Sequence, residues 1–217
     1  MNFDSSLFDR AAKFAIDAHH GVERRGKGYP YILHPMEAAI IVASLTSDEE
    51  MLAAAILHDT VEDTDVTIDQ IRELFGDRVA TLVHNETAPL PHGTPWRIRR
   101  RAQADLIAAA PRDSKIVAIG DKLSNLRTIV ADYRQIGDSL WQRFKAPNGK
   151  EDIVWYYGIL AEALSDLSGT PPYEEFLELL KSLTPLPGRE FGERSSELSG
   201  CGSINSELRA PNSELRG

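Results

Sequence analysis

The sequence predicts an all-α fold, and three observations support this. Apolar residues recur at helical spacing through most of the 217 residues. No segment alternates between polar and apolar residues as a half-buried strand does. Residues that favour helix N-termini stand where the periodic segments begin. These residues are Ser47, Thr67, Asp77, Thr94 and Asp113.

Loops and capping signals divide the first half of the chain into helices. We expect a loop rich in glycine and basic residues at residues 21–31. Pro35 suits the first position of the next helix, because the N–H that proline lacks would have no partner there, and this places His34 at the helix entrance. Capping-box spacing at Ser47 opens the helix that leads to His58. The helices expected in this half begin near residues 4–6, 35, 47, 67 and 77.

Proline residues mark the boundaries in the second half. Residues 88–95 hold three prolines and a glycine and are expected to form a loop, from whose end Thr94 starts a long helix. Pro111 ends that helix, because a proline ring cannot be accommodated in a helix interior. Asp113 can cap the helix that follows. The last two helices are expected at residues 151–168 and 172–183.

The C-terminal segment differs in composition from the rest of the chain. Large apolar residues become rare after Thr184, and Ser-Glu-Leu recurs at Ser196, Ser206 and Ser213. Such a segment cannot bury enough apolar surface to order itself. We therefore expect one folded domain over residues 1–183 and a flexible, low-complexity tail over residues 184–217.

Composition limits the classes of function. The net charge of -9 argues against a general nucleic-acid binder, which needs a basic face. No apolar run approaches the roughly 20 residues that span a bilayer, and residues 1–10 lack the features of a signal peptide. The single cysteine, Cys201, permits no intramolecular disulfide. We expect a cytoplasmic protein that binds neither nucleic acid nor membrane; the oligomeric state stays open.

Two local clusters of basic residues stand out against this acidic background. They lie at residues 24–27 and 97–101. A cluster of this kind is more often a solvated face than an anion site, so neither indicates a function by itself. An aromatic-rich segment at residues 141–157 either closes a pocket or packs the last helices.

His58 and Asp59 form the most informative dipeptide of the chain. They close the apolar run at residues 53–57, where an imidazole and a carboxylate are costly to bury without a partner. A divalent metal would be such a partner, and His34 and Asp121 could complete a set of two histidines and two aspartates. Mixed nitrogen and oxygen ligands suit Mn²⁺, and a bound ion makes water nucleophilic near neutral pH. The chain is therefore interpreted as a metal-dependent hydrolase.

Polar residues also follow Asp121 at helical spacing. Asn125 and Thr128 come four and seven residues after it, so the three side chains can point into one pocket. The same spacing fits a hydrated helix face, and spacing alone favours that simpler interpretation.

Four segments together resemble one known family. The segments are Arg-Gly-Lys-Gly-Tyr-Pro-Tyr-Ile-Leu-His-Pro at 25–35, Ala-Ala-Ile-Leu-His-Asp-Thr-Val-Glu-Asp-Thr at 54–64, Phe-Gly-Asp-Arg-Val-Ala at 75–80 and Gly-Asp-Lys-Leu-Ser-Asn-Leu-Arg-Thr at 120–128. They resemble motifs of the HD-domain phosphohydrolases, and the closer resemblance is to the hydrolase domain of the alarmone-degrading RelA/SpoT proteins and their single-domain relatives. The resemblance covers roughly residues 8 to 165, with the motifs in the family's order.

The resemblance implies an HD-domain helical bundle and a role for each matching residue. Glu62 and Asp63 would act beside the metal, and Arg25 would stack on the purine base. Asn125 and Thr128 would contact the ribose or its phosphates. The implied metal ligands are His34, His58, Asp59 and Asp121, and the implied substrate-binding residues are Arg25, Lys27, Lys122, Asn125 and Thr128.

Two departures from the family pattern bear on substrate choice. Residues 84–88 read His-Asn-Glu-Thr-Ala where the family has a Gly-Val-Thr-Lys-like stretch. Lys122 and Ser124 replace the family's usual Arg and His. Both departures leave the metal ligands intact and leave the base and phosphate specificity open.

Three functions follow for comparison. The leading hypothesis is a Mn²⁺-dependent hydrolase that removes pyrophosphate from the 3′ position of (p)ppGpp-like nucleotides. The first alternative keeps the chemistry but takes another nucleotide, such as the 3′-phosphate of NADPH or a nucleoside monophosphate. The second alternative is a sensor that binds a nucleotide without turnover. The sequence speaks against it, because a pure sensor does not need both a complete set of metal ligands and the Glu62-Asp63 pair.

Overall fold

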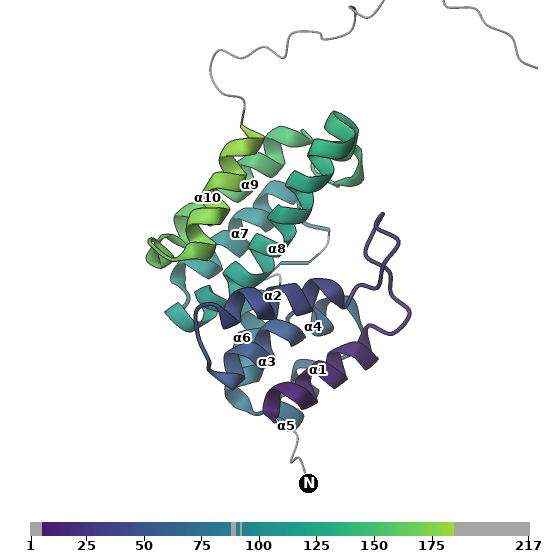
Figure 1. Ribbon diagram of the computed structural model, residues 1–217, viewed down its shortest axis with the longest axis vertical. Coiled ribbons are helices and arrows are strands. Elements are labelled where there is room, and N and C mark those ends of the chain that lie inside the picture. Colours follow the sequence, from purple (N-terminus) through teal and green to yellow (C-terminus); the bar gives the residue numbers. More distant parts are fainter. Residues whose placement is uncertain (1–5, 88–89, 92, 185–217) are drawn as a thin grey trace, which may run out of the picture. The chain divides into compact units, whose positions relative to one another are not determined.

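The computed structural model describes residues 6–87, 90–91 and 93–184. These residues form α-helices and short 3-10 helices without a strand (Figure 1), which confirms the predicted all-α fold. An isolated bridge between Glu23 and Pro30 closes the loop before α2. The elements are α1 (Leu7–Ala18), α2 (Leu33–Ala43), α3 (Glu49–Leu57), α4 (Thr60–Asp63), α5 (Ile68–Phe75), α6 (Asp77–Glu86), α7 (Trp96–Ala109), α8 (Arg112–Ile136), η1 (Gly137–Arg143), α9 (Lys150–Ala163), η2 (Ser165–Leu167) and α10 (Pro171–Leu183).

Side-chain caps explain where several helices begin. Ser6 and Asp9 form a capping box at the start of α1, at 3.2 and 3.3 Å, and Thr67 forms one at the start of α5, as predicted. The capping box expected at Ser47 is wrong. Asp48 caps α3 instead, because its carboxylate accepts hydrogen bonds from the second and third backbone N–H groups of the helix.

Other helix starts differ from expectation by one or two residues. α2 begins at Leu33, so Pro35 stands at its third position rather than its first; its missing N–H still belongs to the four that lack intrahelical partners. α8 begins directly after Pro111, so Asp113 lies in its first turn and does not cap it. Gly76, not Asp77, is the residue before α6, and Pro95, not Thr94, is the residue before α7. One helix end also differs, because α9 stops at Ala163 and η2 follows it.

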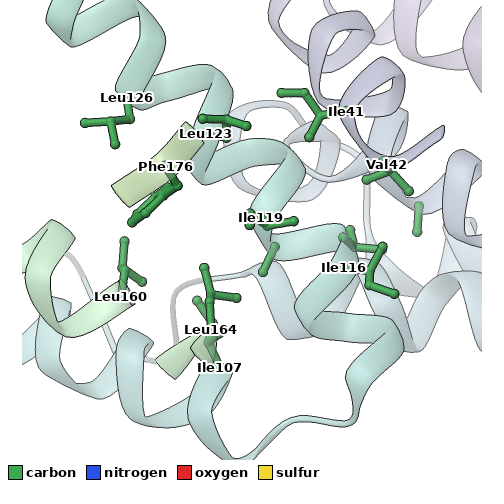
Figure 2. Close-up of a cluster of buried hydrophobic side chains, with 14 of the residues drawn as sticks. Ile41, Val42, Ile107, Ile116, Ile119, Leu123, Leu126, Leu160, Leu164 and Phe176 are labelled. Atoms are coloured by element: carbon green, nitrogen blue, oxygen red, sulfur yellow. The ribbon is translucent and has the colours of Figure 1, made fainter. Parts of the chain in front are cut away.

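The long helix α8 lies at the centre of the described helices. Its apolar side chains Ile119, Leu123 and Leu126 are fully buried. Figure 2 shows them beside side chains of α7, α9 and α10, among them Phe176 and Leu160. Burial of these aliphatic side chains is the main contribution to the stability of the core.

A close approach of α2 and α8 positions the side chains that matter below. These two helices make the most extensive contact between helices in the chain. A Cβ atom added to Gly120 would lie 2.8 Å from the backbone oxygen of Ala38 and 2.8 Å from Val42 Cγ2. Only glycine therefore lets the backbones come so close, next to Asp121 on α8.

The predicted division at residue 183 falls near the end of the described chain. α10 ends at Leu183 and Thr184 is the last residue described. The predicted tail therefore lies outside the described residues and stays a prediction, as does part of the loop expected at residues 88–95. In the part of the chain that the structure describes, no helix combines the length and apolar character needed to cross a bilayer.

Candidate metal centre and nucleotide pocket

Three helices bring the four predicted metal ligands together. His34 comes from the first turn of α2, His58 directly follows α3, and Asp121 lies within α8. The ligand atoms of these three residues all lie within 4.8 Å of one another. Asp59 joins them through Oδ2, which lies 2.9 Å from His58 Nε2 and 3.5 Å from His34 Nε2. Each imidazole thus lies near both carboxylates, at 2.9 to 3.5 Å.

The protonation of His58 shows that the four predicted ligands fit a cation. His58 Nδ1 lies 2.8 Å from the backbone oxygen of Ala55. A carbonyl only accepts, so Nδ1 carries a hydrogen, and in the neutral imidazole Nε2 then presents a lone pair. His58 Nε2 is buried and makes no hydrogen bond with any described residue, although Asp59 Oδ2 is close by. A lone pair facing carboxylate oxygens at such distances fits a divalent ion with nitrogen and oxygen ligands.

The charges around the site support ionised carboxylates. Burial alone would raise the pKa of Asp121, but the Lys122 ammonium and the two imidazoles hold it well below its usual range. Burial likewise opposes ionisation of Asp59, whose pKa the His58 imidazole nevertheless holds well below its usual range. Burial lowers the pKa of His58, yet the charges of Asp59 and Asp121 raise it overall. A proton and a metal ion therefore compete for this imidazole.

Glu62 and Asp63 lie on the short helix α4 beside the predicted metal ligands and reach the same cavity. Both side chains are exposed, yet the pKa of each is raised. The first cause is partial desolvation by the walls of the cavity, and the second is the charge of Asp59. A carboxyl whose pKa is shifted toward neutrality is suited to exchanging protons with a substrate.

A single cavity of about 460 Å³ extends from the metal ligands. This volume is typical of a small-molecule site. All five of the predicted substrate-binding residues line it, as do Glu62 and Asp63 and the predicted ligands His34, Asp59 and Asp121. The substrate-binding residues are Arg25, Lys27, Lys122, Asn125 and Thr128.

Comparison with known proteins identifies the family of this chain. The family model described as "HD domain" matches residues 11–149. The chain belongs to the HD domain family. The predicted all-α fold class and the predicted resemblance to HD-domain phosphohydrolases are thereby confirmed.

Curated relatives of this HD domain carry alarmone-related names. The "guanosine-3′,5′-bis(diphosphate) 3′-pyrophosphohydrolase" of Aquifex aeolicus is 39% identical over 127 residues, which cover 55% of this chain and 17% of that protein. The "bifunctional (p)ppGpp synthase/hydrolase SpoT" of Escherichia coli K12 is 39% identical over 121 residues, or 53% of this chain and 17% of that protein. The match thus spans about a sixth of the length of these relatives.

Solved structures also resemble this HD domain. One is reported for a metazoan ortholog of SpoT that hydrolyzes ppGpp; it has a TM-score of 0.66 and 24% identity, over 83% of this chain and 97% of that one. At that identity the likeness concerns the fold alone. A crystal structure of a Listeria monocytogenes EGD-e protein has a TM-score of 0.61 and 30% identity, over 68% of this chain and 96% of that one.

The predicted substrate-binding residues of this HD domain differ in their partners. Arg25 is exposed and makes no side-chain hydrogen bond or ion pair with any described residue, so its guanidinium is available. Lys27 pairs with Asp132 across the cavity. Lys122 is buried and binds Asp121 and, at 3.4 Å, Glu86. The ammonium of Lys122 therefore pairs directly with Asp121, a predicted metal ligand. The sequence motif did not indicate this contact.

Arg24 and Tyr31 were missed by the sequence analysis and are part of the site. Tyr31 Oη donates to Asp59 Oδ2 at 2.6 Å, and Arg24 Nη2 donates to Asn125 Oδ1 at 2.6 Å. The Arg24 guanidinium lies 5.3 Å from the centre of the Tyr31 ring, within the range of a cation–π contact. Both residues lie in or beside the basic loop motif, and this motif was the sequence signal that could have identified them.

The basic cluster on α7 was expected to be a solvated face, and the structure corrects this in part. Arg99 and Arg100 line the cavity. Arg97 donates to the buried carboxylate of Asp152 at 2.6 Å, and Arg101 pairs with Asp105 at 2.9 Å. Helical periodicity thus turns two of the four arginines toward the cavity and two away from it.

The aromatic-rich segment combines both of its expected roles. Phe144, Tyr156 and Tyr157 line the cavity. Trp155 instead lies under the Arg97 guanidinium, 4.8 Å from it, and Trp141 packs against Tyr133. The segment therefore closes one side of the pocket and also packs the helices that follow α8.

Proposed function

We propose that this HD domain is a Mn²⁺-dependent phosphohydrolase that removes the 3′-pyrophosphate from (p)ppGpp-like nucleotides. The observation that carries the proposal is the convergence of two imidazoles and two carboxylates at one end of a cavity with basic walls. The names of the curated relatives support the choice of substrate class.

His34, His58, Asp59 and Asp121 would hold one divalent ion. The mixed nitrogen and oxygen donors suit Mn²⁺ among the common divalent ions. When bound, such an ion polarises a phosphoryl oxygen and lowers the pKa of a coordinated water. Tyr31 supports this arrangement, because its hydroxyl group donates to Asp59 and leaves that carboxylate with one fixed orientation.

Glu62 and Asp63 would manage the protons of the reaction. Hydrolysis adds water to the phosphorus and breaks its bond to the 3′ oxygen, so the attacking water loses a proton and the departing oxygen gains one. The raised pKa of each carboxyl suits it to one of these transfers. Their position on α4 places them directly after the His58-Asp59 pair.

The basic walls of the cavity would hold the nucleotide. Arg25 is free to stack on the purine base, since a guanidinium plane can cover a ring and still donate hydrogen bonds. Lys27, Asn125 and Thr128 would contact the ribose or its phosphates. Lys122 would act at the metal end, where Asp121 and Glu86 hold its ammonium.

A Mn²⁺-supplemented screen of ppGpp, pppGpp, NADPH and nucleoside monophosphates tests the proposal. We expect pyrophosphate and GDP from ppGpp, and loss of turnover when a chelator removes the ion. Phosphate release from NADPH with ppGpp untouched would replace the substrate class and keep the chemistry. Tight binding of ppGpp without any product would make the domain a sensor and overturn the proposal.

A further inference from the structure

A chain of hydrogen bonds leads from His34 to side chains that do not line the cavity. His34 Nδ1 lies 2.8 Å from Ser124 Oγ, and Ser124 Oγ donates to Glu37 Oε2 at 2.8 Å. Glu37 Oε1 in turn accepts from Arg127 Nη1 at 3.0 Å. Four side chains of α2 and α8 are thus connected, and one of them is a predicted metal ligand.

The direction of these hydrogen bonds determines which nitrogen of His34 carries the hydrogen. The Glu37 carboxylate can only accept, so the single hydrogen of the Ser124 hydroxyl points toward Glu37. Ser124 Oγ must then accept from His34, which places the hydrogen on Nδ1. In the neutral imidazole His34 Nε2 then has a lone pair, and it lies 3.1 Å from Asp121 Oδ1, which suits an ion held by both atoms.

The two histidines of the site reach this tautomer in different ways. His58 donates to a backbone oxygen of its own helix, which no side-chain substitution removes. His34 depends on the Ser124 hydroxyl, which is 1% exposed. The orientation of one ligand is therefore set by the backbone, and that of the other by a side chain from a different helix.

Helical spacing aligns the connection with the metal site. Glu37 follows His34 by three residues on α2, and Ser124 follows Asp121 by three residues on α8, so each pair lies on one helix face. At the far end, Arg127 binds both oxygens of Glu175 on α10, at 2.7 and 2.6 Å. The neutral Ser124 is buried, whereas the side chains of Glu37 and Arg127 are each 36% exposed, so no unpaired charge is buried.

We propose that Ser124 and Glu37 are positioning residues for the metal site. They hold His34 with the hydrogen on Nδ1 and keep its ring turned so that Nε2 faces Asp59 and Asp121. Arg127, held by Glu175, keeps the Glu37 carboxylate in place. The proposal rests on the metal site of the proposed function and adds residues that the sequence motif did not assign.

The first experiment measures Mn²⁺ affinity by calorimetry on the full chain after chelator treatment. Ser124→Ala should weaken binding by roughly 10- to 100-fold, the usual effect of removing a partner of a ligating histidine. Glu37→Gln, which retains an acceptor but loses the charge, should weaken it less. The matched control is Ser114→Ala, which removes another buried, hydrogen-bonded hydroxyl from the same helix, away from the cavity, and should leave the affinity unchanged.

The second experiment reads the tautomer of His34 directly by ¹⁵N NMR of metal-free protein. In the wild type, Nδ1 should carry the hydrogen; in Ser124→Ala, the populations of the two tautomers should shift. Wild-type Mn²⁺ affinity together with an unchanged tautomer in Ser124→Ala would overturn the positioning role.

The two experiments also separate this inference from the proposed function. If the wild type bound no metal, the metal site would be wrong while the NMR measurement still decided the role of Ser124. Glu37→Gln changes a partly exposed side chain, so it provides a folded variant even if Ser124→Ala is unstable. Circular dichroism verifies that each variant keeps its helix content.

Discussion

Asp48 Oδ2 lies 2.8 Å from Arg78 Nη1, so the residue that caps α3 is also bound by a cation from α6. The same guanidinium donates to Glu50 at 2.6 Å and to Asp113 of α8 at 2.8 Å. One arginine thus connects α3, α6 and α8, and α8 carries the predicted ligand Asp121. The arrangement stabilises the end of α3 opposite His58.

Asp48→Asn should make stability less dependent on pH. Burial would raise the pKa of Asp48, but hydrogen bonds from Arg78 and the backbone hold it below its usual range. The ionised form is therefore stabilising: its contribution is complete above the unfolded pKa of about 3.9 and disappears as the pH falls through the lower folded value. Asparagine still caps the helix, so only the charge effect is lost.

Denaturant titrations from pH 7 down to pH 3 measure this effect. At pH 7 the variant should be less stable by about 0.2–1 kcal/mol, as for a solvent-accessible pair, and the gap should close in acid. Asp105→Asn, which alters an exposed pair on α7, should show a smaller gap. A constant difference between wild type and Asp48→Asn at every pH would contradict the assignment.

Gly120→Ala should destabilise the fold, although alanine favours helices by about 1 kcal/mol over glycine. The added Cβ would lie 2.8 Å from the Ala38 oxygen, so α2 and α8 must separate, at a cost of about 1–3 kcal/mol for overpacking. Mn²⁺ binding should weaken with it. Gly158→Ala on α9 has no atom within 4 Å of the new Cβ and should stabilise; equal effects of the two substitutions would refute the steric argument.

Asp59→Ala should remove the metal while sparing most of the helix content. Its carboxylate lies near both imidazoles, and it is not one of the apolar side chains that form the core. Elemental analysis and circular dichroism measure the two effects separately. Full metal occupancy in this variant would show that Asp59 is not a ligand.

Glu62→Gln and Asp63→Asn should separate chemistry from metal binding. Each keeps the size of the side chain and removes its ability to exchange a proton, so turnover should fall by roughly 10²- to 10⁴-fold if that group transfers a proton. The Mn²⁺ content should stay at the wild-type level. Unchanged turnover in both variants would assign the proton transfers to other groups.

Arg25→Ala should raise KM with little change in kcat. Stacking on a base remote from the reacting phosphate stabilises the ground state and the transition state equally, so its loss raises KM. The lost stacking is worth roughly 1–3 kcal/mol by analogy with aromatic platforms. Arg25→Lys should not restore affinity, because an ammonium has no planar face. Steady-state kinetics on the best substrate measure KM and kcat for both variants. A wild-type KM in Arg25→Ala would show that Arg25 does not stack on the base and is a solvated charge.

The proximity of His34, His58, Asp59 and Asp121 could be predicted from sequence because these residues lie in short, recognisable motifs. The pairing of Lys122 with Glu86 could not, since it joins residues far apart in the chain through the packing of α6 on α8. The prediction of a solvated face for the α7 arginines was wrong in part for a similar reason. A run of like charges does not reveal which side chains face a cavity. Ser47 and Asp48 are both good caps, and only the backbone geometry chooses between neighbours.

The predicted metal ligands lie on or next to three helices. They are far apart in the sequence, from His34 on α2 to Asp121 on α8. An ion that binds all of them binds the folded chain and not the unfolded one. At a free concentration of one hundred times its Kd it would add about 2.7 kcal/mol to stability. The stability of the fold and the occupancy of the site would then rise and fall with the same supply of the ion.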